Sequence, residues 1–126
     1  MSETEETGIV VAPAQAKKSY AYQPPIDEEK LRKQLIYYVY RGKEEADKEP
    51  WFPGNLFDVR LGEDRLGEAQ VILVEAQRLE DLTQYDAMLT GFGEDVEELR
   101  NAIRSWLGFR TEARKEGFFK VLYRWI

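Results

Sequence analysis

The sequence of 126 residues contains no cysteine and no histidine. The lack of cysteine excludes disulfide bonds, thiolate nucleophiles and sulfur-ligated metals. The lack of histidine removes the commonest transition-metal ligand and the usual general base near neutral pH. Serine–histidine–aspartate triads and the usual zinc sites are therefore impossible, and we expect no metal, no cofactor and no catalytic residue of these kinds.

The sequence also lacks the apolar run of about 20 residues that a membrane-spanning helix requires. Its first seven residues carry three glutamates and no basic residue, the opposite of a signal or transit peptide. These features predict a cytoplasmic protein that does not bind membranes. Residues 1–16 are predicted to be a flexible acidic tail, and residues 17–126 suffice for one monomeric domain.

The net charge of −6 gives the whole chain no general attraction to nucleic acid. Charge is unevenly distributed, however. Residues 99–126 carry seven basic residues against two acidic ones. This last part of the chain can form a local basic patch, although charges solvated on separate faces are the simpler interpretation.

The pattern of apolar and turn-forming residues predicts an α+β fold with the element order β-α-β-β-α-α-β. Tyr20 and Tyr22 ahead of Pro24 indicate a short edge strand. Residues 71–74 are all apolar, which is typical of an interior strand covered on both faces. The expected strands are 17–23, 56–60, 69–77 and 118–125, and the expected helices are 27–41, 83–89 and 95–107.

The ends of the helices are predicted from capping residues. Asp27 is placed as the N-cap of the first helix, and Gly42 as the residue that stops it. Asp95 and Gly108 bound the last helix in the same way. Residues 42–55 are expected to form a polar loop.

Several short phrases follow one another in a specific order along the chain. They are Arg41-Gly42-Lys43, residues 52–59, residues 67–74 running into 79–82, Asp86-Ala87 followed by Gly91-Phe92, and residues 118–125. These phrases and the order of the elements resemble the ASCH domain, a PUA-like β-barrel fold associated with RNA binding. The resemblance spans about residues 18–126 and implies a small mixed β-barrel or sheet with three helices packed around it.

The family's signature, Gly-x-Lys-x-x-Thr-x-Arg, is degenerate in this chain. Counted from Gly42, the Lys, Thr and Arg positions hold Glu44, Asp47 and Glu49. The family's Glu-Gly-Phe appears at residues 90–92 as Thr-Gly-Phe. Some ASCH-like proteins hydrolyse acylated nucleosides with the Lys, Thr and Glu of these motifs. None of the three is retained, so we expect no enzyme activity.

The resemblance points to a cleft at the mouth of the barrel as the binding site. Cations beside aromatic rings offer phosphate contacts and a stacking surface, which is worth ~1–3 kcal/mol per unpaired base. The alternative is that Trp51 and Phe52 plug the barrel end and that Arg41 caps a helix. Trp106 and Trp125 are expected in the core. The predicted nucleic-acid-binding residues are Arg41, Lys43, Trp51, Arg60, Thr90 and Phe92.

Three functions remain open at this point. The first is a non-enzymatic ASCH-like domain that binds single-stranded RNA or another nucleic-acid ligand. The second is a protein-interaction or regulatory domain of accessory or phage type, with Trp51 and Phe52 as anchors for a protein partner. The third is a residual amidohydrolase that uses Lys43 and a relocated carboxylate.

Overall fold

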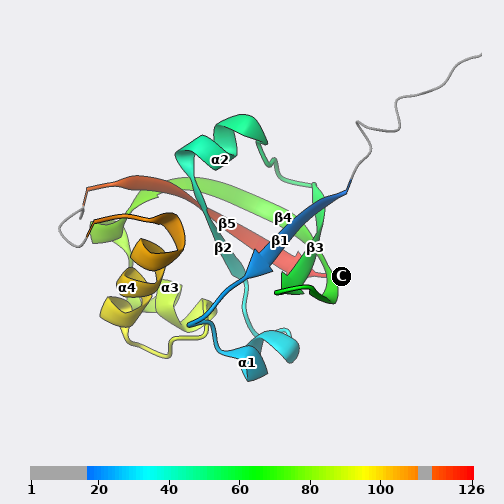
Figure 1. Cartoon of the computed structure of the whole chain (residues 1–126), viewed down its shortest axis with the longest axis horizontal. Coiled ribbons are helices and arrows are strands. Elements are labelled where there is room, and N and C mark those ends of the chain that lie inside the picture. Colours follow the sequence, from blue (N-terminus) through cyan, green and yellow to red (C-terminus); the bar gives the residue numbers. More distant parts are fainter. Residues whose placement is uncertain (1–16, 111–114) are drawn as a thin grey trace, which may run out of the picture.

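The computed structural model describes residues 17–110 and 115–126, so the predicted tail at 1–16 lies outside the described residues. A five-stranded sheet with the strand order β1-β3-β4-β5-β2 curls into a half-barrel (Figure 1). Strand β1 pairs with β3 in parallel, and the other neighbours are antiparallel. The strands are β1 Lys18–Tyr22, β2 Tyr38–Gly42, β3 Leu56–Leu61, β4 Asp64–Arg78 and β5 Gly117–Trp125.

Helices lie at both ends of the half-barrel (Figure 1). They are α1 Glu28–Arg32, α2 Lys43–Lys48, α3 Gln84–Leu89 and α4 Val96–Leu107, with a 3-10 turn, η2, at Leu79–Asp81. The predicted fold class, a mixed sheet with helices packed around it, is confirmed. The described residues contain four α-helices, one more than expected, and none of them is long and apolar enough to cross a bilayer.

The predicted helix at 27–41 is wrong beyond its first turns. Asp27 caps α1 as expected, and its side chain accepts a hydrogen bond from the Lys30 backbone amide. The helix then ends because Gln34 adopts a left-handed conformation with φ 60°. The chain restarts as strand β2, so Arg41 lies on a strand rather than at a helix end.

The predicted polar loop at 42–55 is also wrong in its first half, where α2 forms. Gly42, expected to stop a helix, instead precedes α2 as its N-cap. The Glu45 side chain accepts a hydrogen bond from the Gly42 amide at 3.2 Å, which satisfies an exposed donor at the helix start. The sequence motif around Gly42 is therefore a strand-to-helix junction.

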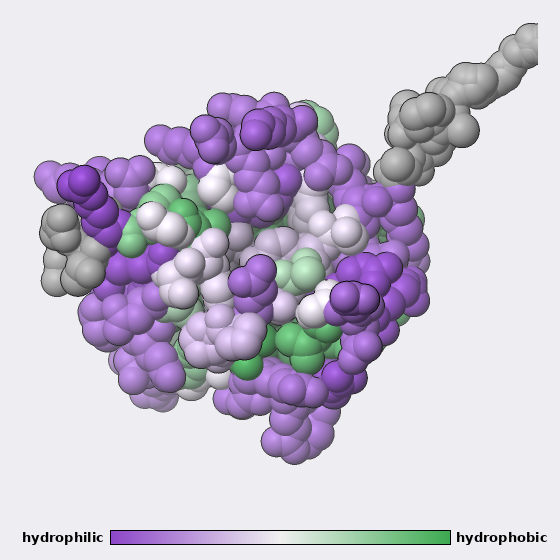
Figure 2. All heavy atoms as spheres, in the orientation of Figure 1, coloured by the Kyte–Doolittle hydropathy of each residue, from purple (hydrophilic) through white to green (hydrophobic). Residues whose placement is uncertain are grey.

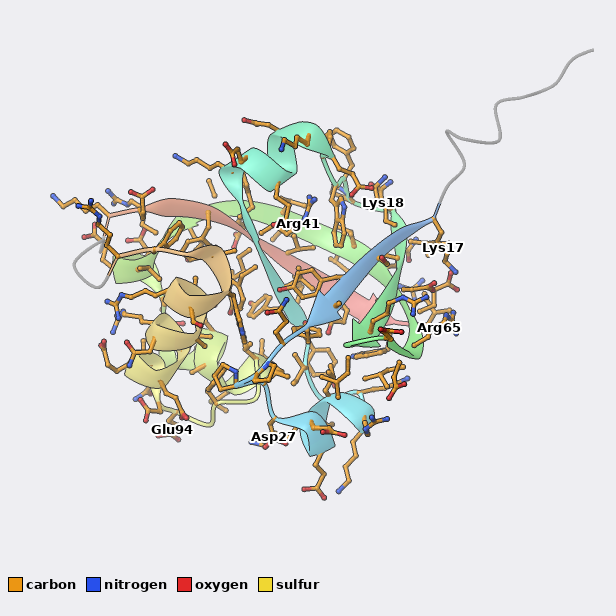
Figure 3. The ribbon with its side chains drawn as sticks, in the orientation of Figure 1. Lys17, Lys18, Asp27, Arg41, Arg65 and Glu94 are labelled. Carbon is orange, nitrogen blue, oxygen red and sulfur yellow. The ribbon has the colours of Figure 1, made fainter. Side chains whose placement is uncertain are left out.

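An ion cluster fastens the edge strand β1 to its neighbours. The Lys17 ammonium lies 3.2 Å from the Asp58 carboxylate of β3 and also pairs with Glu68 of β4. Arg65 approaches Asp58 at 3.0 Å. Burial alone would raise the pKa of Asp58, but the hydrogen bonds from Lys17 and Arg65 outweigh it and hold that pKa below its usual value. Figure 3 shows Lys17 and Arg65 on the same side of the molecule.

The central strand β4 is longer than predicted, and one of its faces is open. Val71 is buried, as expected, but Ile72 and Leu73 are 47% and 43% exposed. A register shift between Val71 and Leu73 opposite β5 marks an irregularity at which the strand departs from simple alternation. The expectation that residues 71–74 are covered on both faces is therefore wrong for the described chain.

Aromatic side chains fill the inside of the half-barrel. The Trp51 and Phe57 rings lie 4.6 Å apart, and the Phe57 and Tyr123 rings 5.2 Å apart, within the range of favourable aromatic pairs. A second buried cluster, which includes Leu99 and Ile103 of α4, packs against the outside of β2 and β5. Asp95 and Gly108 bound α4 as predicted.

A buried ion pair joins α3 to the sheet. The Lys120 ammonium on β5 lies 2.6 Å from the Asp86 carboxylate, and both side chains are less than one-tenth exposed. Burial lowers the pKa of Lys120, but the hydrogen bond and charge of Asp86 outweigh this, so the net pKa is raised. The alternation of β5 predicts that Lys120 points to solvent, and that prediction is wrong.

We expect Lys120→Met to lower the free energy of unfolding by about 3–5 kcal/mol, because it leaves the Asp86 carboxylate buried without its partner. Urea unfolding at pH 7, followed by tryptophan fluorescence, measures the change. Arg78→Met is the matched control: its ion pairs with Glu80 and Asp81 are exposed, so about 1 kcal/mol or less is expected. Equal losses for the two variants would contradict a stabilising role for the buried pair.

Candidate functional site

The two edge strands of the sheet, β1 and β2, come together without pairing. They stand at opposite ends of the strand order, yet the end of β1 lies beside the start of β2 (Figure 1). The Tyr22 hydroxyl of β1 donates a hydrogen bond to the Tyr38 carbonyl of β2 and contacts the Tyr123 hydroxyl at 3.0 Å. We call this junction of β1 and β2 the seam.

A cleft of about 200 Å³ opens in the seam. One wall is the outer edge of β1, another is formed by β2 and α2, and the C-terminal end of α4 completes it. Figure 2 views the molecule from the side of β1 and shows weakly polar and apolar surface between strongly hydrophilic rims. The lining residues are Ser19, Tyr20, Ala21, Gln23, Tyr40, Glu45, Trp106 and Leu107.

The aromatic surface of this seam cleft comes from Trp106. Its ring is nearly parallel to that of Tyr40, with an interplanar angle of 25° and a centroid separation of 6.5 Å. Its indole N–H donates to the Pro24 carbonyl at 2.9 Å, which fixes the orientation of the ring. The apolar stripe of α4 predicts Trp106 in the core, whereas the structure leaves it half-buried at the seam.

Two of the predicted site residues support the seam cleft from behind. Thr90 is fully buried, and its hydroxyl contacts the Tyr40 hydroxyl and donates to the Asp86 carbonyl, each at 2.7 Å. Phe92 packs against Trp106 with a ring separation of 6.2 Å. Neither residue lines the cleft itself; together they hold its two aromatic rings in place.

Arg41 and Trp51 lie together, but in a separate place. The Arg41 guanidinium sits 4.4 Å above the Trp51 ring and donates to the Glu49 carbonyl at 2.8 Å. Burial lowers the pKa of Arg41, only partly offset by Glu45 and Glu49. Figure 3 shows Arg41 beneath α2. Both residues line a cavity of about 210 Å³ on the Val74 and Val121 side of the sheet, away from Tyr40.

The remaining two predicted residues are elsewhere. Lys43 lines a pocket of about 250 Å³, which we call the basic pocket because Lys43, Arg78 and Lys115 outnumber its one carboxylate. That carboxylate belongs to Asp81 and lies 3.3 Å from the Arg78 guanidinium. Gly117 lets the Lys43 side chain lie close to the β5 backbone, because a β-carbon at this position would lie 2.7 Å from the Lys43 Cε and would displace the end of that side chain. Arg60 lies at the β3–β4 hairpin and donates to the Glu63 carbonyl at 3.0 Å.

The basic pocket adjoins the seam cleft across Gly42. A β-carbon on Gly42 would lie 4.0 Å from Leu107, which lines the cleft, and Lys43 follows directly into the pocket. The Tyr40 ring of the cleft is 5.9 Å from the Phe118 ring of the pocket. The six predicted residues thus fall into four places. The basic pocket adjoins the seam cleft at Gly42, and the Arg41 cavity adjoins it at α2, where the Arg41 guanidinium lies 3.9 Å from the Glu45 carboxylate.

The cleft chemistry is that of hydrogen bonding and stacking. Burial raises the pKa of Tyr20 and of Tyr40, so both phenols stay protonated at neutral pH. Glu45 supplies a carboxylate acceptor at the rim. Within residues 17–110 and 115–126, no group of three or more acidic side chains is arranged to hold a metal ion.

No family model and no curated protein matches the sequence. Solved structures do match over most of the chain. Protein EF3133 from Enterococcus faecalis V583, described by the family model DUF984, superimposes with a TM-score of 0.64 at 11% identity, covering 86% of this chain and 76% of that one.

Two further solved structures match this fold over most of the chain. The ASCH domain from Lactobacillus crispatus JV V101 gives a TM-score of 0.62 at 12% identity and covers 93% of this chain and 86% of its own. Hypothetical protein PH0355 gives 0.60 at 18% identity, with 87% and 99% covered. At such low identities the likeness concerns the fold alone. The half-barrel with its seam is therefore an ASCH-like, PUA-like fold, as the sequence phrases around Gly42 and Gly91 predict.

Proposed function

We propose that this ASCH-like domain binds single-stranded RNA in the seam cleft and does not transform it. The observation that carries the proposal is the partly buried Trp106 ring, held nearly parallel to Tyr40 in a cleft bordered by an unpaired strand edge. An unpaired base stacks on such a ring, while backbone amides and carbonyls along the β1 edge are free to bond its polar groups.

The charge of the cleft favours a base over a phosphate. Glu45 lines the cleft, and none of its described lining residues is basic. A carboxylate repels phosphate but accepts hydrogen bonds from an exocyclic amino group, as acidic side chains do from cytosine. The phosphate contacts are assigned to the adjacent basic pocket, where Lys43, Arg78 and Lys115 outnumber Asp81 and the exposed Arg78–Asp81 pair costs little to break. The proposed RNA path therefore runs from the basic pocket across Gly42 into the seam.

The absence of catalysis is inferred from the side chains at the degenerate motifs. Glu44 and Asp47 replace the family's Lys and Thr, and the Thr90 hydroxyl is buried in bonds to Tyr40 and Asp86. Lys43 faces the basic pocket rather than the seam cleft. Lys120, although buried against a carboxylate, has a raised pKa and stays an ammonium without a lone pair for attack.

Stacking on Trp106 can be tested with labelled RNA. We expect short oligocytidine to bind at low salt more tightly than oligouridine, and Trp106→Ala to weaken binding by about 1–3 kcal/mol. Fluorescence anisotropy measures both, and Tyr85→Ala, which removes an exposed aromatic outside the cleft, is the matched control. Glu45→Gln should reduce the preference for cytosine. Binding that is absent, or indifferent to Trp106, rules out the seam as the RNA site.

The basic pocket predicts how binding depends on salt. Three phosphate contacts to a single strand give a log–log slope of about −2. We expect Lys43→Ala and Lys115→Ala each to make this slope shallower by about 0.7. Lys33→Ala, which removes an exposed lysine paired with Glu29, should leave the slope unchanged. A slope near zero in the unaltered protein would show that the pocket contacts no phosphate.

The non-enzymatic assignment makes a separate prediction. Incubation with an N-acylated nucleoside should release no more free nucleoside than buffer alone, measured by liquid chromatography. Turnover that disappears in Lys43→Ala would instead establish the residual amidohydrolase.

A further inference from the structure

The outer face of β4 and β5, away from the seam, carries an uncovered apolar groove. Ile72 is 47% exposed there, although the sequence around it predicts burial. Leu35, at 48% exposure, lies across the groove on the segment between α1 and β2. Single exposed apolar residues are ordinary, but a contiguous set is typical of a binding surface.

The outer groove encloses about 700 Å³, more than three times the 200 Å³ of the seam cleft. Its floor is formed by β4 and β5, and one wall by the chain from Lys33 to Tyr37. Backbone hydrogen bonds make that wall rigid: the Tyr37 amide donates to Leu89 at 2.8 Å and the Tyr123 amide donates to Tyr37 at 3.0 Å. The apolar side chains that line it are Leu35, Tyr37, Ile72, Leu89, Leu122 and Trp125.

The charges at the outer groove have one sign. Lys33 and Arg124 are its charged lining residues, and no carboxylate of the described chain lines it, although the protein as a whole carries −6. Arg124 donates to the neutral Gln70 amide oxygen at 2.9 Å. Lys33 pairs with Glu29 only in an exposed contact, which costs little to break. Both cations are therefore available to an anionic partner.

We propose that the outer groove binds an acidic amphipathic segment of a partner protein. Apolar side chains of the segment fill the groove above Ile72 and Leu122, and flanking carboxylates pair with Lys33 and Arg124. A second copy of this chain suits the surface less well, because a two-fold contact would set cations against cations. The surface is distinct from the seam, so the inference does not depend on RNA binding.

The test uses two designed helical peptides. Both carry leucines at three- and four-residue spacing; one has glutamates and the other lysines at the remaining positions. We expect the acidic peptide to bind the full chain at least about tenfold more tightly, a difference that narrows with added salt. Ile72→Asp should abolish binding, and Arg124→Glu should reverse the preference. Phe52→Asp, at an exposed aromatic outside the groove, should change nothing.

Thermal melting verifies that each variant is folded, and analytical ultracentrifugation is run at the same concentrations. Equal binding of the two peptides overturns the proposal, as does binding that survives Ile72→Asp in a folded protein. Self-association that Ile72→Asp abolishes shows a second copy in the groove. Peptide binding that appears only after deletion of residues 1–16 shows that this chain's own segment is the occupant. Either result also overturns the proposal.

Discussion

Two free sheet edges that meet without pairing are the constraint on which the rest of the molecule depends. A barrel closes when its first and last strands exchange backbone hydrogen bonds. Here β1 and β2 occupy the ends of the sheet, and the Tyr22 hydroxyl bridges them by donating to the Tyr38 carbonyl, while it also contacts the Tyr123 hydroxyl of β5. The Tyr22 side chain, rather than backbone hydrogen bonds, holds the two strands together. It leaves a gap between them, and that gap is the seam cleft.

Local signals in the sequence were sufficient for some elements and misleading for others. Asp95 and Gly108 bound α4 because capping chemistry is encoded by the residues themselves. The end of α1 is different. Gln34 takes a left-handed conformation although it is not glycine, so its residue type does not predict the end of the helix. Tyr38 and Val39 continue the helical spacing of Leu31 and Leu35 by coincidence. They form a strand because residues 38–42 pair with β5.

The same error explains why the predicted site was dispersed. On a helix, residues three and four positions apart share a face, whereas along a strand successive side chains point to opposite sides. Tyr40 therefore turns toward α4 and Arg41 toward Trp51. Trp106 could not be identified from sequence, because an apolar stripe does not reveal that the end of its helix reaches past the sheet to an open seam. The burial of Lys120 likewise depends on Asp86, 34 positions away in the chain.

The position of β1 has one more consequence. This strand joins the sheet through β3 alone, and three of its residues, Ser19, Tyr20 and Ala21, line the seam cleft. The cleft therefore persists only while β1 stays docked. Undocking would dismantle the cleft and would also withdraw the buried Tyr22 side chain from the core inside the half-barrel. A molecule bound between the two edges would contact both β1 and β2 and so join the strands that do not pair with each other. Ligand binding in the seam cleft and docking of β1 are then thermodynamically linked, so each ligand contact to β1 also stabilises the docked strand.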